Sequence, residues 1–277
     1  MIRYTSYLFV LLLSTFSVAA QDKQLVKTWE TDSVLKIPES VLYDAAANTL
    51  YFSNIDGAPD QKDLVGSIGK MKPDGSEIVV EWIKGFSAPK GLGIKGNILY
   101  VADVDEVVLV DTKAAKIIKR IPITGAAFLN DISIAANGDV YVTDSKKGTI
   151  HLLKDDKPTL LLENIPGING VLSTADGLYY VAKGALYKAG TNGGSATKIA
   201  EGMEEGTDGI EQTKSKDFIV SAWVGVIYYI KPDGTKTVLL NTKDQKKSTA
   251  DIGFDKEKEI VYVPTFFTNR VTAYQLK

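Results

Sequence analysis

The sequence predicts an all-β fold, a six-bladed β-propeller. Three observations lead to this prediction: a unit of about forty residues recurs along the chain, each unit holds four short apolar segments separated by turn residues, and no segment shows convincing helical periodicity. Four antiparallel strands in every forty residues are typical of a propeller blade, and a fixed period of this length indicates a repeat architecture.

The repeat is clearest in the first two strands of each unit. The first strand follows a small or polar pair, as in Glu39-Ser40-Val41, and the second carries an aromatic near its centre, as in Leu50-Tyr51-Phe52. The first apolar residue of the inner strand recurs at positions 41, 92, 132, 171, 210 and 252, at intervals of 51, 40, 39, 39 and 42 residues. The chain therefore contains six units in succession.

Each unit continues into two outer strands. In the first unit these are expected over 66–72 and 77–83, and in the fifth over 226–230 and 236–240. The turn Lys72-Pro73-Asp74-Gly75-Ser76 joins the first of these pairs, where proline presets the turn and glycine tolerates a positive φ. Each repeat is thus a four-stranded meander.

The sixth unit is one strand short, because residues 271–276 form its third strand and the chain ends at Lys277. Residues 25–29, ahead of the first unit, form a spare short strand. We expect this N-terminal strand to complete the last blade, since closing the ring removes a sheet edge that would otherwise promote aggregation.

Residues 1–20 resemble a cleavable export signal, with Arg3 before a short apolar run and small residues up to Ala20. The apolar run is about half of what a membrane-spanning helix needs. The sequence therefore predicts a mature domain over 21–277 that is periplasmic or secreted and has no stable membrane anchor. A single domain is expected because six blades and the closing strand account for almost all of it.

The composition of the chain excludes several classes of partner and of catalytic site. The chain has 32 basic and 34 acidic residues, so it lacks the excess of positive charge that binding to nucleic acid requires. It has no cysteine, which excludes thiol nucleophiles and zinc-thiolate sites, and a single histidine, His151. We expect a monomer that acts on a small molecule.

The residue before each inner strand is polar in five of the six units. In a propeller these positions converge on one end of the central channel, where the second strands also end, so Trp223 and the pair Phe266-Phe267 should surround the same mouth. A pocket with convergent polar groups and apolar walls is the default ligand site. The six positions are Glu39, Lys90, Asn130, Asn169, Asp208 and Ala250.

Four of these positions carry only oxygen ligands: two carboxylates, Glu39 and Asp208, and two amides, Asn130 and Asn169. Such a set suits a hard divalent cation, calcium most directly, whereas zinc prefers histidine or cysteine. The opposing interpretation is that asparagine and aspartate occupy turns because they bond to nearby backbone. Recurrence at registered positions of four blades favours the cation site.

At these residues the chain resembles the SMP-30/gluconolactonase family of six-bladed propellers, which is related to paraoxonases and diisopropylfluorophosphatase. The resemblance covers about residues 38–264 and rests on four segments in order and in register. They are Pro38-Glu39-Ser40, Leu129-Asn130-Asp131, Ile168-Asn169-Gly170-Val171 and Thr207-Asp208-Gly209-Ile210.

The resemblance implies hydrolysis of a lactone or related ester with a divalent cation held by Glu39, Asn130, Asn169 and Asp208. Asp208 would be the catalytic residue, as a general base for water or as a nucleophile. Phe128 and Trp223 would shape the substrate pocket. Sugar lactonases of the family commonly have an arginine at the position of Phe128, so a polyol substrate is not expected here.

Lys90 belongs to the same ring and leaves two alternatives open. At roughly 6 Å from a cation and an effective dielectric near 20, its charge costs about 3 kcal/mol. If Lys90 turns aside, it is free to bind an anionic group of a substrate. If it pairs with Glu39 and Asp208 in place of a metal, the protein is a non-catalytic propeller that binds a ligand or another protein. A purely structural repeat domain is the third alternative.

Overall fold

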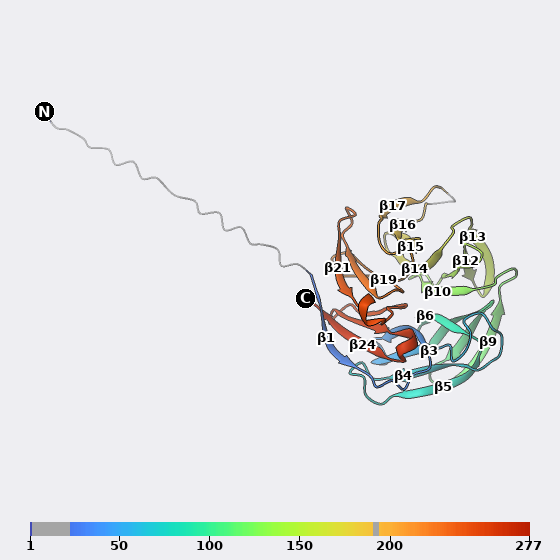
Figure 1. Cartoon of the computed structure of the whole chain (residues 1–277). Coiled ribbons are helices and arrows are strands. Elements are labelled where there is room, and N and C mark those ends of the chain that lie inside the picture. The colour runs from blue at the N-terminus through green and yellow to red at the C-terminus, as the bar shows by residue number, and fades with distance from the viewer. Residues whose placement is uncertain (2–22, 191–193) are drawn as a thin grey trace.

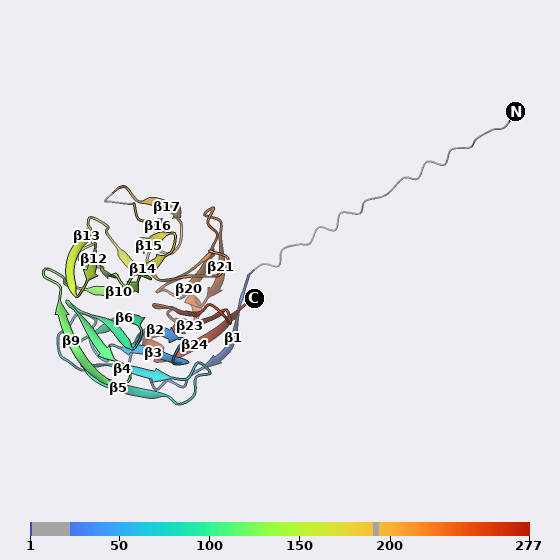
Figure 2. The same ribbon diagram turned by 180° about the vertical axis from the view of Figure 1, so that it is seen from behind.

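The computed structural model describes Met1 and residues 23–190 and 194–277, and it confirms the six-bladed β-propeller (Figures 1 and 2). Six four-stranded antiparallel sheets stand around a central axis. The first strand in the chain is innermost in blades 1 to 5, whereas blade 6 has its N-terminal strand at the outer edge. The predicted export signal lies outside the described residues. None of the helices in the described part is long and apolar enough to cross a membrane.

The first three blades are consecutive meanders. Blade 1 has β2 (Pro38–Asp44), β3 (Thr49–Asn54), β4 (Gly66–Met71) and β5 (Val79–Phe86). Blade 2 has β6 (Pro89–Lys95), β7 (Ile98–Asp103), β8 (Glu106–Asp111) and β9 (Lys116–Pro122). Blade 3 has β10 (Leu129–Ile134), β11 (Val140–Asp144), β12 (Thr149–Lys154) and β13 (Lys157–Leu162).

The remaining blades follow the same plan until the ring closes. Blade 4 has β14 (Ile168–Thr174), β15 (Gly177–Ala182), β16 (Ala185–Lys188) and β17 (Thr197–Ala200). Blade 5 has β18 (Thr207–Gln212), β19 (Phe218–Ala222), β20 (Val226–Ile230) and β21 (Lys236–Asn241). Blade 6 has β22 (Gly253–Asp255), β23 (Ile260–Pro264), β24 (Val271–Leu276) and β1 (Leu25–Glu30), with short 3₁₀ turns η2 (Lys243–Gln245) and η3 (Phe266–Thr268) nearby.

The N-terminal strand completes the last blade as predicted. β1 pairs antiparallel with β24, from Leu25 opposite Leu276 to Glu30 opposite Thr272, and the two strands lie side by side in both views (Figures 1 and 2). The first and last elements of the domain are thus joined by backbone hydrogen bonds.

The core lies between blades rather than in the channel. One cluster of buried apolar side chains fills each interface between neighbouring sheets. Between blades 1 and 6, for example, Phe52 and Met71 pack with Tyr262 and Val271. Because each blade buries both faces against its neighbours, the ring holds the inner strands at fixed positions around the axis.

A recurrent irregularity sets the geometry of the channel. In blades 1 to 5 the pairing register between the first two strands shifts at the same place, between Pro38 and Val41 in blade 1 and at the matching residues of the others. Such a bulge leaves two residues unpaired and re-aims their side chains. The predicted ring residues are the first members of these bulges. They therefore lie within the inner strands of five blades and not ahead of them.

Candidate active site

The five bulges bring the predicted ring residues to one end of the channel. Glu39, Lys90, Asn130 and Asp208 are buried, and Asn169 is partly exposed. Ala250, the sixth position, is buried and contributes no polar group. The mouth therefore presents two carboxylates, two amides and one ammonium from five different blades.

In three of the five bulges a backbone N–H donates to a hydroxyl group of the adjacent second strand. The N–H groups of Ser40, Asp131 and Gly209 donate to side-chain oxygens of Ser53, Thr143 and Ser221, at 3.0, 2.9 and 2.8 Å respectively. These bonds fix the bulges without help from the channel. The ring side chains of these three bulges are consequently positioned by the backbone.

The two carboxylates of the mouth each have an oxygen without a partner. Glu39 Oε2 and Asp208 Oδ1 are buried and accept no hydrogen bond from any described residue. Burial raises the pKa of Glu39 well above its usual range, and the charges of Asp208 and Asp251 add to this, while Lys90 opposes it. Burial likewise raises the pKa of Asp208, with Asp251 adding and the neighbouring Asn169 amide opposing.

Lys90 turns away from the carboxylates. Its Nζ donates to the carbonyl oxygen of Ala88 at 2.9 Å and lies 4.3 Å from the centroid of the Phe128 ring. Within the described residues no ion pair joins Lys90 to Glu39 or Asp208. The bond to Ala88 agrees with the first predicted alternative, in which Lys90 turns aside. Burial lowers the pKa of Lys90, although Glu39 lies near enough to oppose this by raising it.

The donor set at the mouth fits a hard cation. The orphaned oxygens of Glu39 and Asp208 need a positive partner, and Asn130, whose amide nitrogen donates to Ser145 at 2.9 Å, has its carbonyl oxygen left to coordinate. Residues 23–190 and 194–277 contain no arrangement of three or more His, Cys, Asp or Glu side chains suited to a metal ion. A cation here would therefore depend on the two amides as well as the two carboxylates.

One side of the mouth is apolar. The Trp223 ring contacts Phe266 and Phe267 in edge-to-face geometry, with centroids 5.4 and 6.0 Å away. Trp223 is 37% exposed and Phe267 67%. Phe128 is partly buried beneath Lys90. Trp223, Phe266 and Phe267 thus lie together, as the repeat predicts.

Several acidic residues near the mouth hold loops instead of a ligand. Asp103 accepts the backbone N–H groups of Ser87 and Ala88, and Asp144 accepts those of Ala127, Lys146 and Lys147. His151 lies on β12, away from the channel, with Nε2 at 3.1 Å from Thr149 Oγ1. None of these groups is one of the oxygen donors predicted to hold a cation.

Sequence reasoning missed the second residue of each bulge. In the five bulges these residues are Ser40, Gly91, Asp131, Gly170 and Gly209, and Asp251 takes the matching place ahead of β22 in blade 6. Gly91 and Gly209 face the carboxylates of Asp131 and Asp251 across blade boundaries. A Cβ on Gly91 would lie 2.7 Å from Asp131 Oδ1, and one on Gly209 2.6 Å from Asp251 Oδ1. Glycine is required at both positions because the neighbouring carboxylate approaches the backbone. The sequence contained the information needed to find these residues, because each of them directly follows a ring position and recurs with the same period.

No protein-family model and no curated protein matches the chain in sequence. Solved structures with the same fold include a gluconolactonase from Xanthomonas campestris, with a TM-score of 0.67, 13% identity, and 88% of this chain and 87% of that one covered. A calcium-binding protein, regucalcin, from Agrobacterium tumefaciens gives 0.66 and 16%, covering 87% and 91%. Virginiamycin B lyase from Staphylococcus aureus gives 0.66 and 13%, covering 92% and 100%.

Proposed function

We propose that this chain is an exported hydrolase of a lactone or related ester, and that it uses a divalent cation, calcium most directly, at the mouth of its channel. The observation that carries the proposal is the pair of buried oxygens, Glu39 Oε2 and Asp208 Oδ1, without partners among the described residues. A buried carboxylate without a partner is costly, and one cation would satisfy both. The shared fold of a gluconolactonase and a calcium-binding protein supports the proposal.

Glu39, Asn130, Asn169 and Asp208 would hold the cation through oxygen atoms. When bound, the cation supplies a Lewis acid that polarises the substrate carbonyl and stabilises the negative charge that develops on its oxygen.

Asp208 is the residue we assign to the chemistry. Asn169, beside it, orients the carboxylate, and the uncommitted Oδ1 is available either to take a proton from water or to attack the carbonyl carbon. Hydrolysis in ¹⁸O-labelled water under single-turnover conditions separates the two roles, because only direct attack places the label in Asp208.

The walls of the mouth favour an ester with an apolar portion. Phe128 packs under Lys90 at the position where the family resemblance implies a polyol-binding arginine, and Trp223 with Phe266 extends the apolar surface. Lys90 has N–H groups beyond the one given to Ala88 and would bind an anionic or carbonyl oxygen of the substrate.

The test is a panel of aliphatic lactones, sugar lactones and aryl esters, assayed after chelation and again after calcium is restored. We expect turnover of apolar lactones or esters that disappears with chelator and returns with calcium, together with one calcium site by calorimetry. Absence of turnover across the panel, with no calcium binding, would refute the proposal and favour a non-catalytic binding propeller. Export is tested by N-terminal sequencing of the protein from the periplasm or medium, with Gln21 expected first.

A further inference from the structure

The exposed large apolar side chains of the propeller are unevenly divided between its two ends. Apart from Met1 there are twelve, of which six lie on outermost strands and six lie in loops at the mouth end. Among residues 23–190 and 194–277, none lies in a turn at the opposite end. The six at the mouth, which we call the apolar crescent, are Val34, Leu64, Val65, Trp223, Val224 and Phe267.

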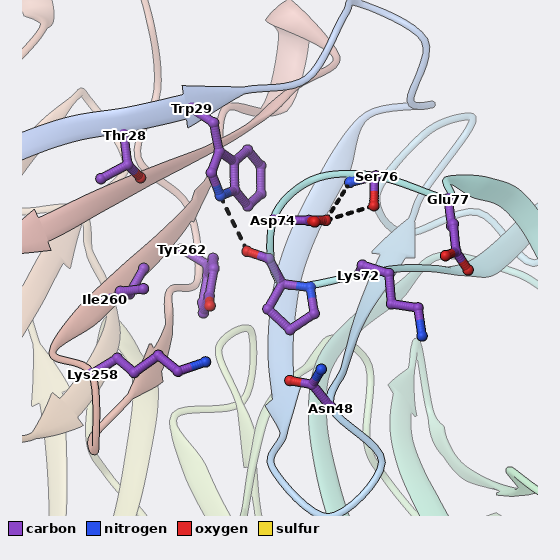
Figure 3. A pocket seen from close by; sticks show the side chains of 11 residues that line it. Thr28, Trp29, Asn48, Lys72, Asp74, Ser76, Glu77, Lys258, Ile260 and Tyr262 are labelled. Atoms are coloured by element: carbon purple, nitrogen blue, oxygen red, sulfur yellow. Dashed lines mark hydrogen bonds between the residues drawn. The ribbon is translucent and has the colours of Figure 1, made fainter.

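The turns at the opposite end are polar by comparison, as Figure 3 shows for blades 1 and 6. Asn48, Asp74 and Lys258 lie in three of these turns. Trp29, on β1 beside them, is partly buried, and its Nε1 donates to the carbonyl oxygen of Pro73 at 3.1 Å. The exposure of apolar side chains is therefore a property of the mouth end and not of the propeller loops in general.

The crescent is continuous from blade 5 to blade 6 and onward to the start of blade 1. The rings of Trp223 and Phe267 pack edge to face, with centroids 6.0 Å apart. Val34 follows Ser33, whose hydroxyl donates to the carbonyl oxygen of Thr268 at 2.8 Å. Because Thr268 directly follows Phe267, the loop that carries Val34 lies against the turn that carries Phe267.

Leu64 and Val65 extend the crescent into blade 1. They belong to the β3–β4 loop, residues 55–65, whereas the matching loops of the other blades have two to six residues. An ion pair of 2.9 Å between Lys36 Nζ and Asp56 ties this loop to the connection that carries Val34. Leu64 is 58% exposed at φ +61°, a backbone conformation that is uncommon for a residue other than glycine. The extra length of blade 1 thus places apolar side chains in contact with solvent.

The charges beside the crescent are either paired or mainly acidic. Lys62 pairs with Asp105 at 2.8 Å, and Lys243 pairs with Glu204. Acidic residues predominate among the charged residues of these loops that form no ion pair within the described part of the chain. These residues are Asp32, Asp60, Asp63, Glu205, Asp244 and Lys246. An anionic surface would therefore be repelled, whereas a neutral one would not.

The chemistry of the crescent favours a lipid surface as its partner. Its side chains come from four separate loops, so they reach a partner as individual groups. A folded protein partner would need a packed interface core complementary to all four loops, whereas a fluid bilayer adapts to them. Tryptophan is enriched at membrane–water interfaces, and Trp223 is the aromatic side chain between Phe267 and the channel mouth.

We propose that the apolar crescent docks the protein reversibly on a zwitterionic lipid bilayer, with the mouth of the channel toward the lipid. Trp223, Phe267 and Leu64 enter the boundary between head groups and acyl chains, and the acidic residues around them stay in water. Docking of this kind uses exposed side chains and not a membrane-spanning helix. It does not depend on the proposed hydrolase activity or on a bound cation.

The test is flotation of the full mature chain with phosphatidylcholine vesicles, repeated with vesicles in which part of this lipid is replaced by anionic phosphatidylglycerol. We expect binding to phosphatidylcholine, and weaker binding when phosphatidylglycerol is present. Leu64→Ser combined with Phe267→Ser should lower the partition coefficient about tenfold or more, because two large apolar side chains no longer leave water. The melting temperature should stay the same, since both side chains are exposed.

The matched control is Ile118→Ser combined with Leu160→Ser. It removes two apolar side chains of similar exposure, 46% and 53%, from outermost strands away from the mouth. This variant should bind vesicles as the unaltered protein does. If the crescent variant lowers the melting temperature, Val34→Ser combined with Val224→Ser replaces it, and unchanged vesicle binding in that variant would contradict the proposal.

Three further results would overturn the proposal. They are no flotation with phosphatidylcholine, an equal loss of binding in the crescent variant and the control, and tighter binding when phosphatidylglycerol is present. Sedimentation without lipid tests the other occupant of the surface. A dimer that the crescent variant abolishes, together with no vesicle binding, would assign the crescent to a second copy of the chain instead.

Discussion

The carboxylates at the mouth and those deeper in the channel share an environment but differ in their bonding. Glu39 and Asp208 at the mouth, and Asp131 and Asp251 below them, are largely enclosed by protein, and burial raises the pKa of all four. For Asp251 the value reaches about 7. Neither burial nor pKa therefore separates a ligand-binding carboxylate from a structural one in this protein.

Hydrogen bonds make the distinction. Asp131 accepts the backbone N–H groups of Ile132 and Val171, each at 2.7 Å, and the second bond crosses from blade 3 to blade 4. Asp251 accepts the Ser40 hydroxyl at 2.5 Å and so links blade 6 to blade 1. The mouth pair has no comparable protein bonds on Glu39 Oε2 and Asp208 Oδ1. Asp131 and Asp251 therefore join neighbouring blades, whereas Glu39 and Asp208 each keep an oxygen that is available to a ligand.

The largest effect is expected for Asp208→Asn. Removing the carboxylate should lower kcat/KM roughly 10²–10⁴-fold, because the proposed base or nucleophile is lost. The melting temperature should hold or rise, since a neutral amide replaces a carboxyl group whose charged form is disfavoured by burial and by the charge of Asp251. Steady-state kinetics and calorimetry check both. The control is Asp105→Asn, a partly exposed mouth carboxylate paired with Lys62, and equal activity loss in both variants would contradict the assignment.

Asp131→Ala should show the opposite pattern. It leaves the N–H groups of Ile132 and Val171 without their acceptor, so the free energy of unfolding should fall by roughly 2–4 kcal/mol. Urea unfolding measures this change, and activity per folded molecule should stay within a few-fold of the original. An unchanged unfolding midpoint would show that the deeper carboxylates do not join the blades.

Glu211, another channel carboxylate, extends the comparison to pH. Burial raises its pKa from 4.5 to about 8, and the charge of Asp251 adds to this. The folded state holds a proton that the unfolded chain has released, so the free energy of unfolding falls as pH rises from 4.5 to 8. Glu211→Gln should reduce this slope by up to about 1.4 kcal/mol per pH unit.

Urea titrations at several pH values check the Glu211 prediction in the calcium-free protein. The matched control is Glu257→Gln, an exposed carboxylate paired with Lys214 at 2.7 Å. A slope unchanged in Glu211→Gln, or reduced equally in both variants, would show that the channel carboxylate is ionised in the folded state.

The smallest effect is expected for Trp223→Ala. Trp223 is 37% exposed, and its ring packs against the mouth aromatics Phe266 and Phe267. Its loss should raise KM for an apolar ester by about threefold to tenfold and leave kcat unchanged. The reason is that the ring would contribute equally to binding of the substrate and of the transition state. A fall in kcat with constant KM would place Trp223 in the chemistry rather than in substrate binding.

The sequence predicted the blades and the closing strand because both depend on local patterns. Period-two apolar segments, turn residues such as Pro73 and Gly75, and a fixed repeat length act over a few residues each. The convergence of Glu39, Asn130, Asn169 and Asp208 follows from the same repeat. These parts of the site required no knowledge of contacts between distant residues.

The rest depends on contacts that no local pattern encodes. The bulges place Asp131 and Asp251 against glycines of neighbouring blades. The direction of Lys90 is decided by the Ala88 carbonyl and the Phe128 ring. The pocket lined by Trp29, Asp74 and Ile260 is built by three segments that meet only when the ring closes.

The pairing of β1 with β24 constrains the order of folding. Thr28 bonds across 245 positions of sequence to Ala273, so the first strand to be synthesised is among the last to find its partner. Contacts this distant carry a large loop-closure cost and slow folding. We therefore expect ribosome-bound chains that stop before residue 271 to remain open and sensitive to protease, and we expect the addition of β24, residues 271–276, to close the ring.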